Sequence, residues 1–351
     1  MIAHMSDTEK EVSERDHRQI GKELGLFTFS DTVGKGLPLW TPKGTALRRV
    51  LERMIVDEEI KRGYQHVSTP DIAKIDLYKK SGHYPFYKDS MYAPIEADGE
   101  EFMLRPMSCP HHFELYLSQP HSYRELPLRF AEMAKMYRYE LSGVLSGLVR
   151  VRNFCLSDAH IICADKAQAA QEVSGVLDLI DYFSGIFGLR KGEDYWYRLS
   201  LGDRTDAKKY YKDDVAWDAA EEVLRSVLRK RGEKFTEAEN EAAFYGPKID
   251  LHMKDVRGQE NTAFTVQYDF VMPKRFKLGF TDKDGKETEA IVIHRSAVGA
   301  LERLIAFLIE KYNGAFPYWL APVQVKVIPI GEKFLPYAKK IHEQLIAAEI
   351  R

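Results

Sequence analysis

Hydrophobic residues recur at helical spacing in several stretches of the chain. In the segment Thr45–Arg62 they share one side of a helix, and Gly63 is a natural end for it. Asp165 and Gln168 form a helix-capping pair ahead of another apolar-periodic stretch, which Gly188 closes. The pattern predicts helices over Asp16–Leu26, Thr45–Arg62, 165–187, Ser296–Tyr312 and Phe334–Ile350.

Between these helices, short runs with strand character are bounded by polar turns. The predicted strands are Tyr64–Thr69, Phe102–Leu104, Phe130–Glu140, Leu148–Phe154, Tyr195–Leu201, Lys248–Lys254, Thr262–Phe270 and Val323–Ile330. The strands at 130–140 and 148–154 flank the Ser- and Gly-rich stretch Ser142–Gly147, which is typical of an antiparallel pair joined by a loop. The order of elements predicts an α+β fold with an antiparallel sheet.

Pro322 marks the start of a second unit. The strand and helix predicted after it cannot bury an apolar face by themselves, so we expect this unit to be cut short. At the other end, Met1–Met5 contains two methionines and resembles a cloning scar. We therefore expect a scar and polar tail at 1–15, a main domain at 16–321 and a truncated domain at 322–351.

Composition narrows the class of protein without assigning a function. The 351 residues are 44% hydrophobic and 30% charged, and no apolar run approaches the ~20 residues of a membrane span. Three cysteines without paired spacing argue against a disulfide scaffold and for a reducing compartment. These features indicate a cytoplasmic protein with no membrane contact. The net charge of -2 still permits a local basic patch that binds nucleic acid.

Three separated segments carry side chains that suit a metal ion: Arg105–His112, Cys155–His160 and Ile291–Ser296. One thiolate and two imidazoles, with a fourth position open, are typical of a functional zinc. The wide spacing does not identify the ligands. A Cys or His that stands alone in a sequence is more often a buried core residue than a metal ligand. Cys155 and Cys163, in apolar strand contexts, are expected in the core.

A second group of residues suits a nucleotide. Arg138 and Arg150 lie on the two predicted antiparallel strands, where they could hold phosphate oxygens, and Phe154 could stack on a base. Taken alone, the same residues fit a surface hairpin with cross-strand ion pairs. The helical pattern places Arg303 opposite the face made by Leu301, Ile305, Leu308 and Tyr312, which predicts a solvated position.

Together these segments resemble class II aminoacyl-tRNA synthetases. Pro70 after a long helix and strand resembles motif 1, Arg138–Phe154 resembles motif 2, and Gly299–Arg303 resembles motif 3. Four further stretches are similar to threonyl-tRNA synthetases specifically: Pro106–Pro110, Asp158–His160, Ala243–Lys248 and Phe316–Gln324. The resemblance extends from about Asp16 to Arg351. It implies the class II fold, an antiparallel sheet flanked by helices, followed by the start of an α/β anticodon-binding domain.

The resemblance also implies roles for individual residues. One zinc per chain would be held by Cys109, His160 and His294, and it would bind the amino nitrogen and hydroxyl of threonine. Catalysis would depend on Arg138, Lys248 and Arg303. ATP, bound with Mg²⁺, would contact Arg138, Glu140, Arg150, Phe154, Gln267 and Arg303. Threonine would lie against Met107, Asp158, Tyr245 and Gln267.

The implied activity is threonine–tRNA ligation: threonine and ATP form threonyl-adenylate, and the threonyl group passes to the 3′ end of tRNA(Thr). Motif 1 implies a homodimer built on Thr45–Pro70. We expect no counterpart of the family's editing domain in the residues before Asp16. Ser146, Leu156, Ser157 and Thr262 depart from the pattern of many bacterial members, which leaves fine substrate contacts open.

Two other interpretations stay open at this point. A prolyl or seryl enzyme would share motifs 2 and 3, although the Cys109, His160 and His294 set argues against both. A non-catalytic paralogue that binds zinc and nucleotide is the alternative from another functional class, and the presence of Arg138 and Arg303 speaks against it.

Overall fold

The computed structural model describes residues 15–254, 258 and 260–351. The predicted tail at 1–15 therefore lies outside the described residues except for Arg15. An eight-stranded sheet organises the fold, in the order β10-β9-β11-β12-β15-β8-β7-β3. Its strands are β3 (Gln65–His66), β7 (Leu128–Tyr137), β8 (Asn153–Cys163), β9 (Tyr195–Ser200), β10 (Phe235–Ala238), β11 (Lys248–Lys254), β12 (Glu260–Asp269) and β15 (Ile291–Ala300).

The six strands from β9 to β7 pair antiparallel, and only the edge strands β10 and β3 are parallel to their neighbours. This arrangement confirms the predicted α+β class. Smaller sheets are formed by β1 (Phe27–Thr28) with β2 (Leu39–Trp40), by β4 (Ile72–Lys74), β6 (Glu100–Leu104) and β5 (Ile95–Ala97), and by β13 (Gly279–Thr281) with β14 (Glu287–Glu289).

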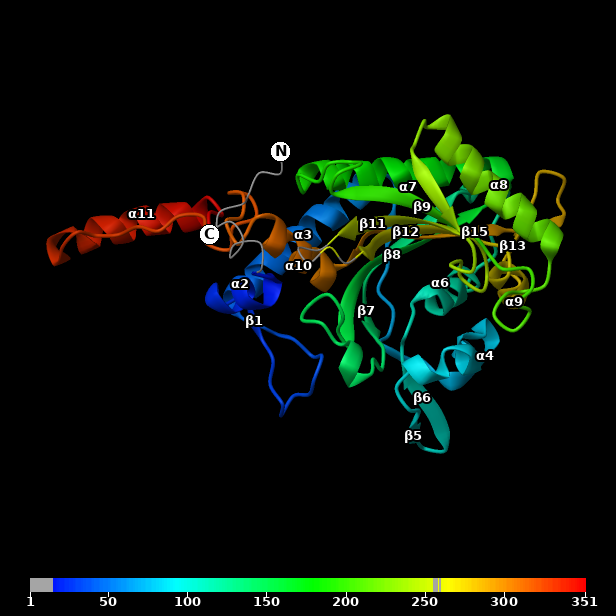
Figure 1. Cartoon of the computed structure of the whole chain (residues 1–351), viewed down its shortest axis with the longest axis horizontal. Coiled ribbons are helices and arrows are strands. Elements are labelled where there is room, and N and C mark those ends of the chain that lie inside the picture. The colour runs from blue at the N-terminus through cyan, green and yellow to red at the C-terminus, as the bar shows by residue number, and fades with distance from the viewer. Residues whose placement is uncertain (1–14, 255–257, 259) are drawn as a thin grey trace, which may run out of the picture.

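Helices lie on both sides of the large sheet (Figure 1). Two long helices, α7 (Lys166–Ile186) and α8 (Asp214–Lys230), pack on one side, and α6 (Cys109–Tyr116), α4 (Ile75–Ser81) and α9 (Met272–Phe276) lie on the other. The remaining helices are α2 (His17–Glu23), α3 (Pro42–Lys61), α5 (His83–Phe86), α10 (Leu301–Lys311) and α11 (Leu335–Ala347). Because both faces are covered, β15 is buried along almost its whole length.

Local sequence signals explain the start of the long helices. The Asp165 side chain accepts a hydrogen bond from the Gln168 amide at the N-terminus of α7, as the capping pair predicts. Thr41 does the same for the Gly44 amide at α3, whose first residue is Pro42. Both helices are confirmed, with α3 beginning three residues before the predicted position.

A buried ion pair joins α3 to the centre of the sheet. Arg295 Nη1 lies 2.6 Å from Glu59 Oε1, and both side chains are almost fully buried. Burial opposes ionisation of Glu59, but the charges of Arg295 and His66 outweigh it and lower its pKa. The helix of motif 1 is thereby held to the strand that carries His294.

Three predicted elements are wrong. Strand β8 begins at Asn153 rather than Leu148, because residues 148–150 fold back onto Ser146 in tight hydrogen-bonded turns. The predicted helix at 296–312 begins only at Leu301, and residues 296–300 complete β15. The structure forms no strand at 323–330; two amides there, Gln324 and Val325, donate to the carbonyl of Arg351.

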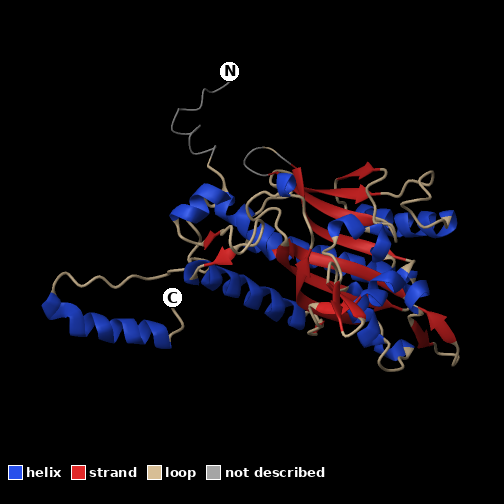
Figure 2. Ribbon diagram, turned by 90° about the horizontal axis from the view of Figure 1, so that it is seen from below, coloured by secondary structure: helices blue, strands red, loops and turns tan. Residues whose placement is uncertain are grey.

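The helix α11 stands apart from the sheet at the end of an extended segment (Figures 1 and 2). None of its residues is buried, although its apolar residues include Leu335, Tyr337 and Ile346. The predicted helix at 334–350 is therefore confirmed in position, while its apolar side lies open. The predicted elements do not include α8, although Trp217, Ala220, Leu224 and Leu228 recur at helical spacing and are buried.

Candidate active site

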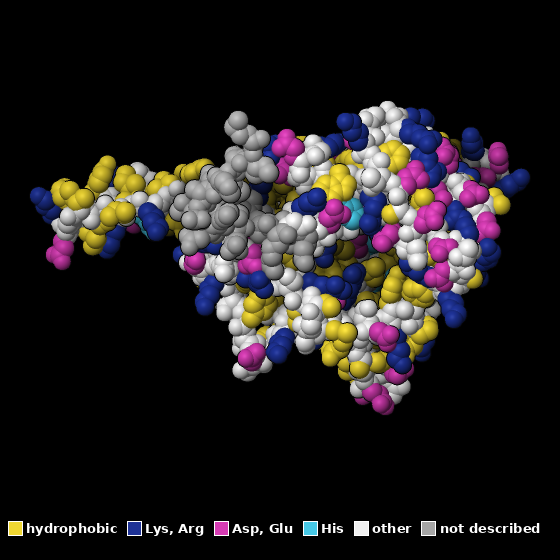
Figure 3. All heavy atoms as spheres, viewed as in Figure 1, with side chains coloured by type: hydrophobic (Ala, Val, Ile, Leu, Met, Phe, Trp, Pro, Cys, Tyr) yellow, Lys and Arg dark blue, Asp and Glu magenta, His cyan; other side chains and the backbone are white. Residues whose placement is uncertain are grey.

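A cavity of about 280 Å³ opens on the face of the sheet opposite α7. In the space-filling view, Lys and Arg side chains lie beside a hollow near the middle of the molecule (Figure 3). Strands β8, β12 and β15 supply its floor, and α6, α10 and the segment before β8 supply its walls. Its lining includes the predicted residues Met107, Cys109, Arg138, Glu140, Arg150, Phe154, Asp158, His160, Tyr245, Gln267, His294 and Arg303.

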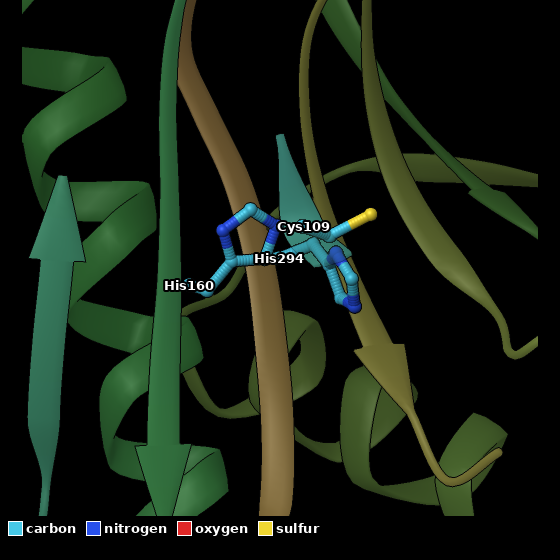
Figure 4. A group of neighbouring side chains, drawn as sticks. All are labelled: Cys109, His160 and His294. Atoms are coloured by element: carbon cyan, nitrogen blue, oxygen red, sulfur yellow. The ribbon is translucent and has the colours of Figure 1, made fainter. Parts of the chain in front are cut away.

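One end of the cavity holds Cys109, His160 and His294 (Figure 4). His160 and His294 are direct neighbours on the antiparallel strands β8 and β15, and Cys109 is the first residue of α6. One potential ligand atom from each residue lies within 4.8 Å of the other two, and all three residues are buried. A sulfur and two imidazole nitrogens form a donor set that suits Zn²⁺, with room for a fourth ligand from the cavity side.

The two histidines are oriented by buried partners. His294 Nε2 lies 2.7 Å from Asp269 Oδ2, and His160 Nδ1 lies 2.8 Å from His112 Nδ1. His112 Nε2 lies in turn 3.2 Å from Glu132 Oε2. These contacts leave His294 Nδ1 and His160 Nε2 for a metal ion, which is the usual division of an imidazole between a ligand bond and an outer hydrogen bond.

Burial determines the protonation of this group. It lowers the pKa of His160 well below its ordinary value, with the neighbouring histidines adding to the effect. The ring is therefore neutral at physiological pH, as a metal ligand must be. Burial also raises the pKa of the Cys109 thiol well above its ordinary value. A bound cation reverses that effect, because it stabilises the thiolate directly.

His83 belongs to this end of the cavity and is absent from the predicted site. Its Nε2 lies 3.8 Å from Cys109 Sγ, its Nδ1 lies 2.7 Å from Ser81 Oγ, and burial lowers its pKa to about 3. His83 is flanked by Gly82 and Tyr84, with no motif around it, so no pattern in the sequence identifies it as a site residue.

The other end of the cavity is lined by arginines. Arg138 lies over the ring of Phe154, with Cζ 5.2 Å from the centroid, and its Nε donates to the Pro106 carbonyl at 3.3 Å. Arg303 donates to the carbonyls of Val149 (3.1 Å) and Thr262 (2.6 Å). Among the described residues, Arg138 and Arg303 donate to carbonyls and a sulfur rather than to carboxylates.

This arrangement concentrates positive charge. Burial, together with the charges of Arg138 and Arg150, lowers the pKa of Arg303 to about 10, and burial also lowers that of Arg138. Arg150 does pair with a carboxylate, since its Nε lies 3.0 Å from Glu140 Oε2. A lowered arginine pKa means that the cation is held at a cost in free energy, which an anionic ligand would relieve.

The solvated position predicted for Arg303 from the helical pattern is wrong. Its side chain is partly buried, because the segment carrying Val149 and Arg150 folds over that side of α10. The family resemblance, by contrast, places Arg303 in the site. Cys155 and Cys163 are buried as expected for core residues.

Between the two ends lie the residues predicted to contact the amino acid. Burial raises the pKa of Asp158, against the hydrogen bond that its Oδ2 accepts from Ser108 Oγ. Tyr245 stacks on His294, with centroids 4.8 Å apart, and its hydroxyl donates to Gln267 Oε1. Arg138 Nη2 lies 3.0 Å from Met107 Sδ, so Met107 connects this region to the arginine end.

Lys248 is the predicted site residue that does not line the cavity. It pairs with Gln267 across β11 and β12, but its ammonium group donates to Asp250 Oδ2 instead.

The four residues that depart from the pattern of many bacterial members lie in different places. Leu156 and Thr262 line the cavity, Ser157 contacts Glu59 at 3.0 Å, and Ser146 lies in the segment before β8.

Comparison with known proteins gives consistent matches. The family described as tRNA synthetase class II core domain (G, H, P, S and T) matches residues 92–312. The structure of the RNA binding domain of threonyl-tRNA synthetase from Cryptosporidium parvum Iowa II superposes with a TM-score of 0.89 and is 36% identical, over 96% of this chain and 82% of that one. The chain belongs to the threonyl-tRNA synthetase family.

Curated members of the threonyl-tRNA synthetase family agree with this assignment. The threonine–tRNA ligase of Geobacillus sp. (strain WCH70) is 52% identical over 96% of this chain, and the threonine–tRNA ligase 1 of Bacillus subtilis (strain 168) is 49% identical over 97%. The chain spans about half the length of these relatives, 52% and 53% respectively. A Giardia lamblia prolyl-tRNA synthetase, 17% identical with a TM-score of 0.68, shares the fold.

These findings confirm the predicted membership of the threonyl-tRNA synthetase family and its class II core. As for membranes, among the helices that the structure describes, none is both long enough and apolar enough to cross a bilayer.

Proposed function

We propose that this chain activates threonine with ATP, forming threonyl-adenylate and pyrophosphate, and passes the threonyl group to the 3′ end of tRNA(Thr). The observation that carries the proposal is the pairing of two unlike ends in one cavity. Arginines without a carboxylate partner suit a polyphosphate, and the Cys109, His160 and His294 group suits a metal that binds an amino acid. Family membership supports the same reaction.

In the proposed first step, a carboxylate oxygen of threonine attacks the α-phosphorus of ATP, which is bound with Mg²⁺. The new P–O bond forms as the bond to the β-phosphate oxygen breaks, and pyrophosphate leaves with its electron pair. Arg138 would contact the α-phosphate and the carboxylate, while Arg150 and Arg303 would contact the γ-phosphate end. Their contribution is to position the reactants and to stabilise charge in a water-poor site.

Recognition of the nucleotide base would fall to two neighbours of these arginines. Phe154, which already lies beneath the Arg138 guanidinium, offers a flat apolar face for adenine, and Glu140 offers acceptor oxygens beside it. Lys248 would reach the reacting phosphate only by leaving Asp250, since its strand partner Gln267 lines the cavity and its own side chain is long and flexible.

Recognition of threonine would fall to the opposite end. A zinc ion held by Cys109, His160 and His294 supplies a Lewis-acid position for the amino and hydroxyl groups of the substrate. Asp158 would accept a hydrogen bond from the threonine hydroxyl, and Met107, Tyr245 and Gln267 would line the space around it. A site built to pair a hydroxyl rejects valine, which has nearly the same shape, because the buried acceptor would be left unpaired.

The wider organisation is also a proposal. We assign 16–321 to the catalytic domain and 322–351 to the first part of an anticodon-binding domain, with the correction that its first segment is extended without forming a strand. The helix α3 and the segment up to Pro70 would form the interface of a homodimer. A groove along α3 carries charges of both signs, among them Arg53, Glu52 and Asp57, and so offers polar partners for a second copy of the chain.

Amino-acid-dependent exchange of pyrophosphate into ATP tests the proposed activation step. We expect exchange with threonine, weaker exchange with serine, and none above background with valine or proline. Serine lacks one methyl group, so its kcat/KM should fall by roughly 10–200-fold. No exchange with any of the four amino acids in zinc-loaded protein would contradict the proposal and favour a non-catalytic paralogue. Preference for proline or serine would contradict the threonine assignment.

A further inference from the structure

The segment that carries Arg150 is held from outside the cavity by a histidine from the first described helix. His17, at the start of α2, is almost fully buried. The Leu148 amide donates to His17 Nε2 at 3.0 Å, so this nitrogen carries no proton. The ring must then be protonated at Nδ1, which lies 2.7 Å from Glu310 Oε1 and donates to it.

Glu310 fixes the histidine as well as accepting from it. The same Oε1 atom accepts from the His17 backbone amide at 3.1 Å. The carboxylate therefore sets both the position of the residue and the tautomer of its ring. Glu310 and Arg303 both belong to α10, about two helical turns apart and hence on the same side of the helix.

The chain between these two contacts is short. Leu148 donates to His17, and the carbonyl of the next residue, Val149, accepts from Arg303 Nε at 3.1 Å. Arg150 follows directly and lines the cavity. One helix, α10, thus holds both sides of this segment, through Glu310 and His17 on one side and through Arg303 on the other.

Gly147 gives independent evidence that the approach of His17 is built into the fold. A Cβ at this position would lie 2.2 Å from His17 Nε2, which is shorter than any real contact, and the backbone has a φ of +48°. Only glycine lets the chain pass so close to the ring while keeping that conformation.

We propose that His17 is a positioning residue of the candidate site: it holds the Leu148 amide and thereby sets the place of Arg150 for the polyphosphate of ATP. The ligand named here rests on the proposed function, whereas the contact itself does not. The role is distinct from catalysis, because His17 lies behind the segment and does not line the cavity.

Two substitutions test the contacts of the two His17 ring nitrogens one at a time. His17→Gln places an amide oxygen near the position of Nε2, so it keeps an acceptor for the Leu148 amide. His17→Asn places an amide N–H near Nδ1, so it keeps a donor for Glu310 and loses the acceptor for Leu148. Lys22→Ala, on the exposed side of the same helix, is the control for a general effect on α2.

The experiment measures hydrogen exchange of the amides at 148–150, together with the ATP dissociation constant by calorimetry in the presence of Mg²⁺. In His17→Asn we expect the hydrogen-exchange rate of the Leu148 amide to rise about tenfold and the ATP dissociation constant to rise about tenfold. A factor of about ten corresponds to the loss of one buried hydrogen bond. His17→Gln and Lys22→Ala should stay within about twofold of wild type. Threonine binding should be unchanged in all variants.

Wild-type exchange and ATP affinity in His17→Asn would overturn the proposal. Equal losses in His17→Asn and His17→Gln would also overturn it, because they would assign the effect to packing or to the Glu310 contact. Thermal unfolding of each variant reports a general loss of folding separately. If the wild-type chain binds no ATP, the proposed function fails, while exchange at Leu148 still decides whether His17 holds the segment.

Discussion

The side chains at the two ends of the cavity have opposite kinds of partner, carboxylates at one end and main-chain carbonyls at the other. At the metal end, the end with Cys109, His160 and His294 that could hold a metal ion, carboxylates stand behind the two histidines. Asp269 contacts His294, and Glu132 contacts His112, which contacts His160. At the arginine end, the guanidinium of Arg303 is held by main-chain carbonyls, which position it without neutralising its charge. The metal end is thus organised within the protein, whereas the arginine end leaves its positive charge for a ligand.

The difference shows how one cavity can bind two unlike groups. Neutral imidazoles with outer carboxylates favour a cation, and the cation then offers an open position to a small polar ligand. Uncompensated arginines favour an anion. Under the proposed function, this difference would orient an amino acid and a polyphosphate in a single direction across the cavity.

The largest expected effect is the loss of a metal ligand. Cys109→Ala should weaken zinc binding by about a thousandfold, since each ligand of a zinc site contributes several kcal/mol. Elemental analysis after gel filtration should then find almost no zinc, against one ion per chain in wild type. Cys163→Ala, at a buried cysteine outside the group, is the matched control and should keep the ion. Zinc retained in Cys109→Ala would remove Cys109 from the ligand set.

The next effect concerns the arginine end. Arg303→Gln should lower kcat/KM for ATP in pyrophosphate exchange by about 300-fold, the usual range for one preorganised donor to developing charge. Its stability without ligand should change by only about 1 kcal/mol, because the lost charge is unfavourable in the free protein.

Arg231→Gln is the contrasting variant at an arginine whose charge is already paired, with Asp178 and Asp181. We expect it to leave exchange kinetics unchanged. An Arg303→Gln protein with wild-type kinetics, or one strongly destabilised without ligand, would contradict the description of the arginine end.

The smallest effect concerns the carboxylate behind His112. Burial alone would raise the pKa of Glu132, but hydrogen bonds from His112 and Thr69 and the charge of Arg105 outweigh it and lower the pKa from 4.5 to about 2. Ionised Glu132 therefore stabilises the fold at neutral pH, and this contribution is lost as pH falls from about 4.5 toward 2. Between about pH 6 and pH 3 the loss should be about 2 kcal/mol.

Urea unfolding across this pH range checks that prediction. Glu132→Gln cannot ionise, so its free energy of unfolding should fall less steeply with acidity than that of wild type, and the two curves should converge at low pH. Parallel curves would mean that Glu132 has an ordinary pKa in the folded protein.

Local signals predicted the parts of the fold that depend on neighbouring residues. The Asp165 cap fixes the start of α7 because a side chain and a nearby amide suffice for it. Strand β8 was placed wrongly at its start and end, since it is buried on both faces and lacks the alternation that marks a half-exposed strand. Residues 148–150 turn back onto Ser146 and are also contacted by His17 and Arg303, which are distant in sequence.

The site residues also divide into those that a sequence pattern identifies and those that only the fold brings together. Family resemblance located the cavity residues, and the structure brings all of them together except Lys248. Helical periodicity misplaced Arg303, because periodicity describes the helix alone and the segment covering that side comes from another part of the chain. His83 had no local signal, since its position beside Cys109 is created only by the packing of α5 against α6.

Gly299 lies where β15 becomes α10, with a φ of +64°. A Cβ there would lie 2.0 Å from the carbonyl oxygen of Ala263 on β12, so every other residue type would force the backbone apart. The join between the strand that carries His294 and the helix that carries Arg303 therefore has no room for a side chain at this position. A single missing Cβ lets one continuous piece of chain supply a residue to each end of the cavity.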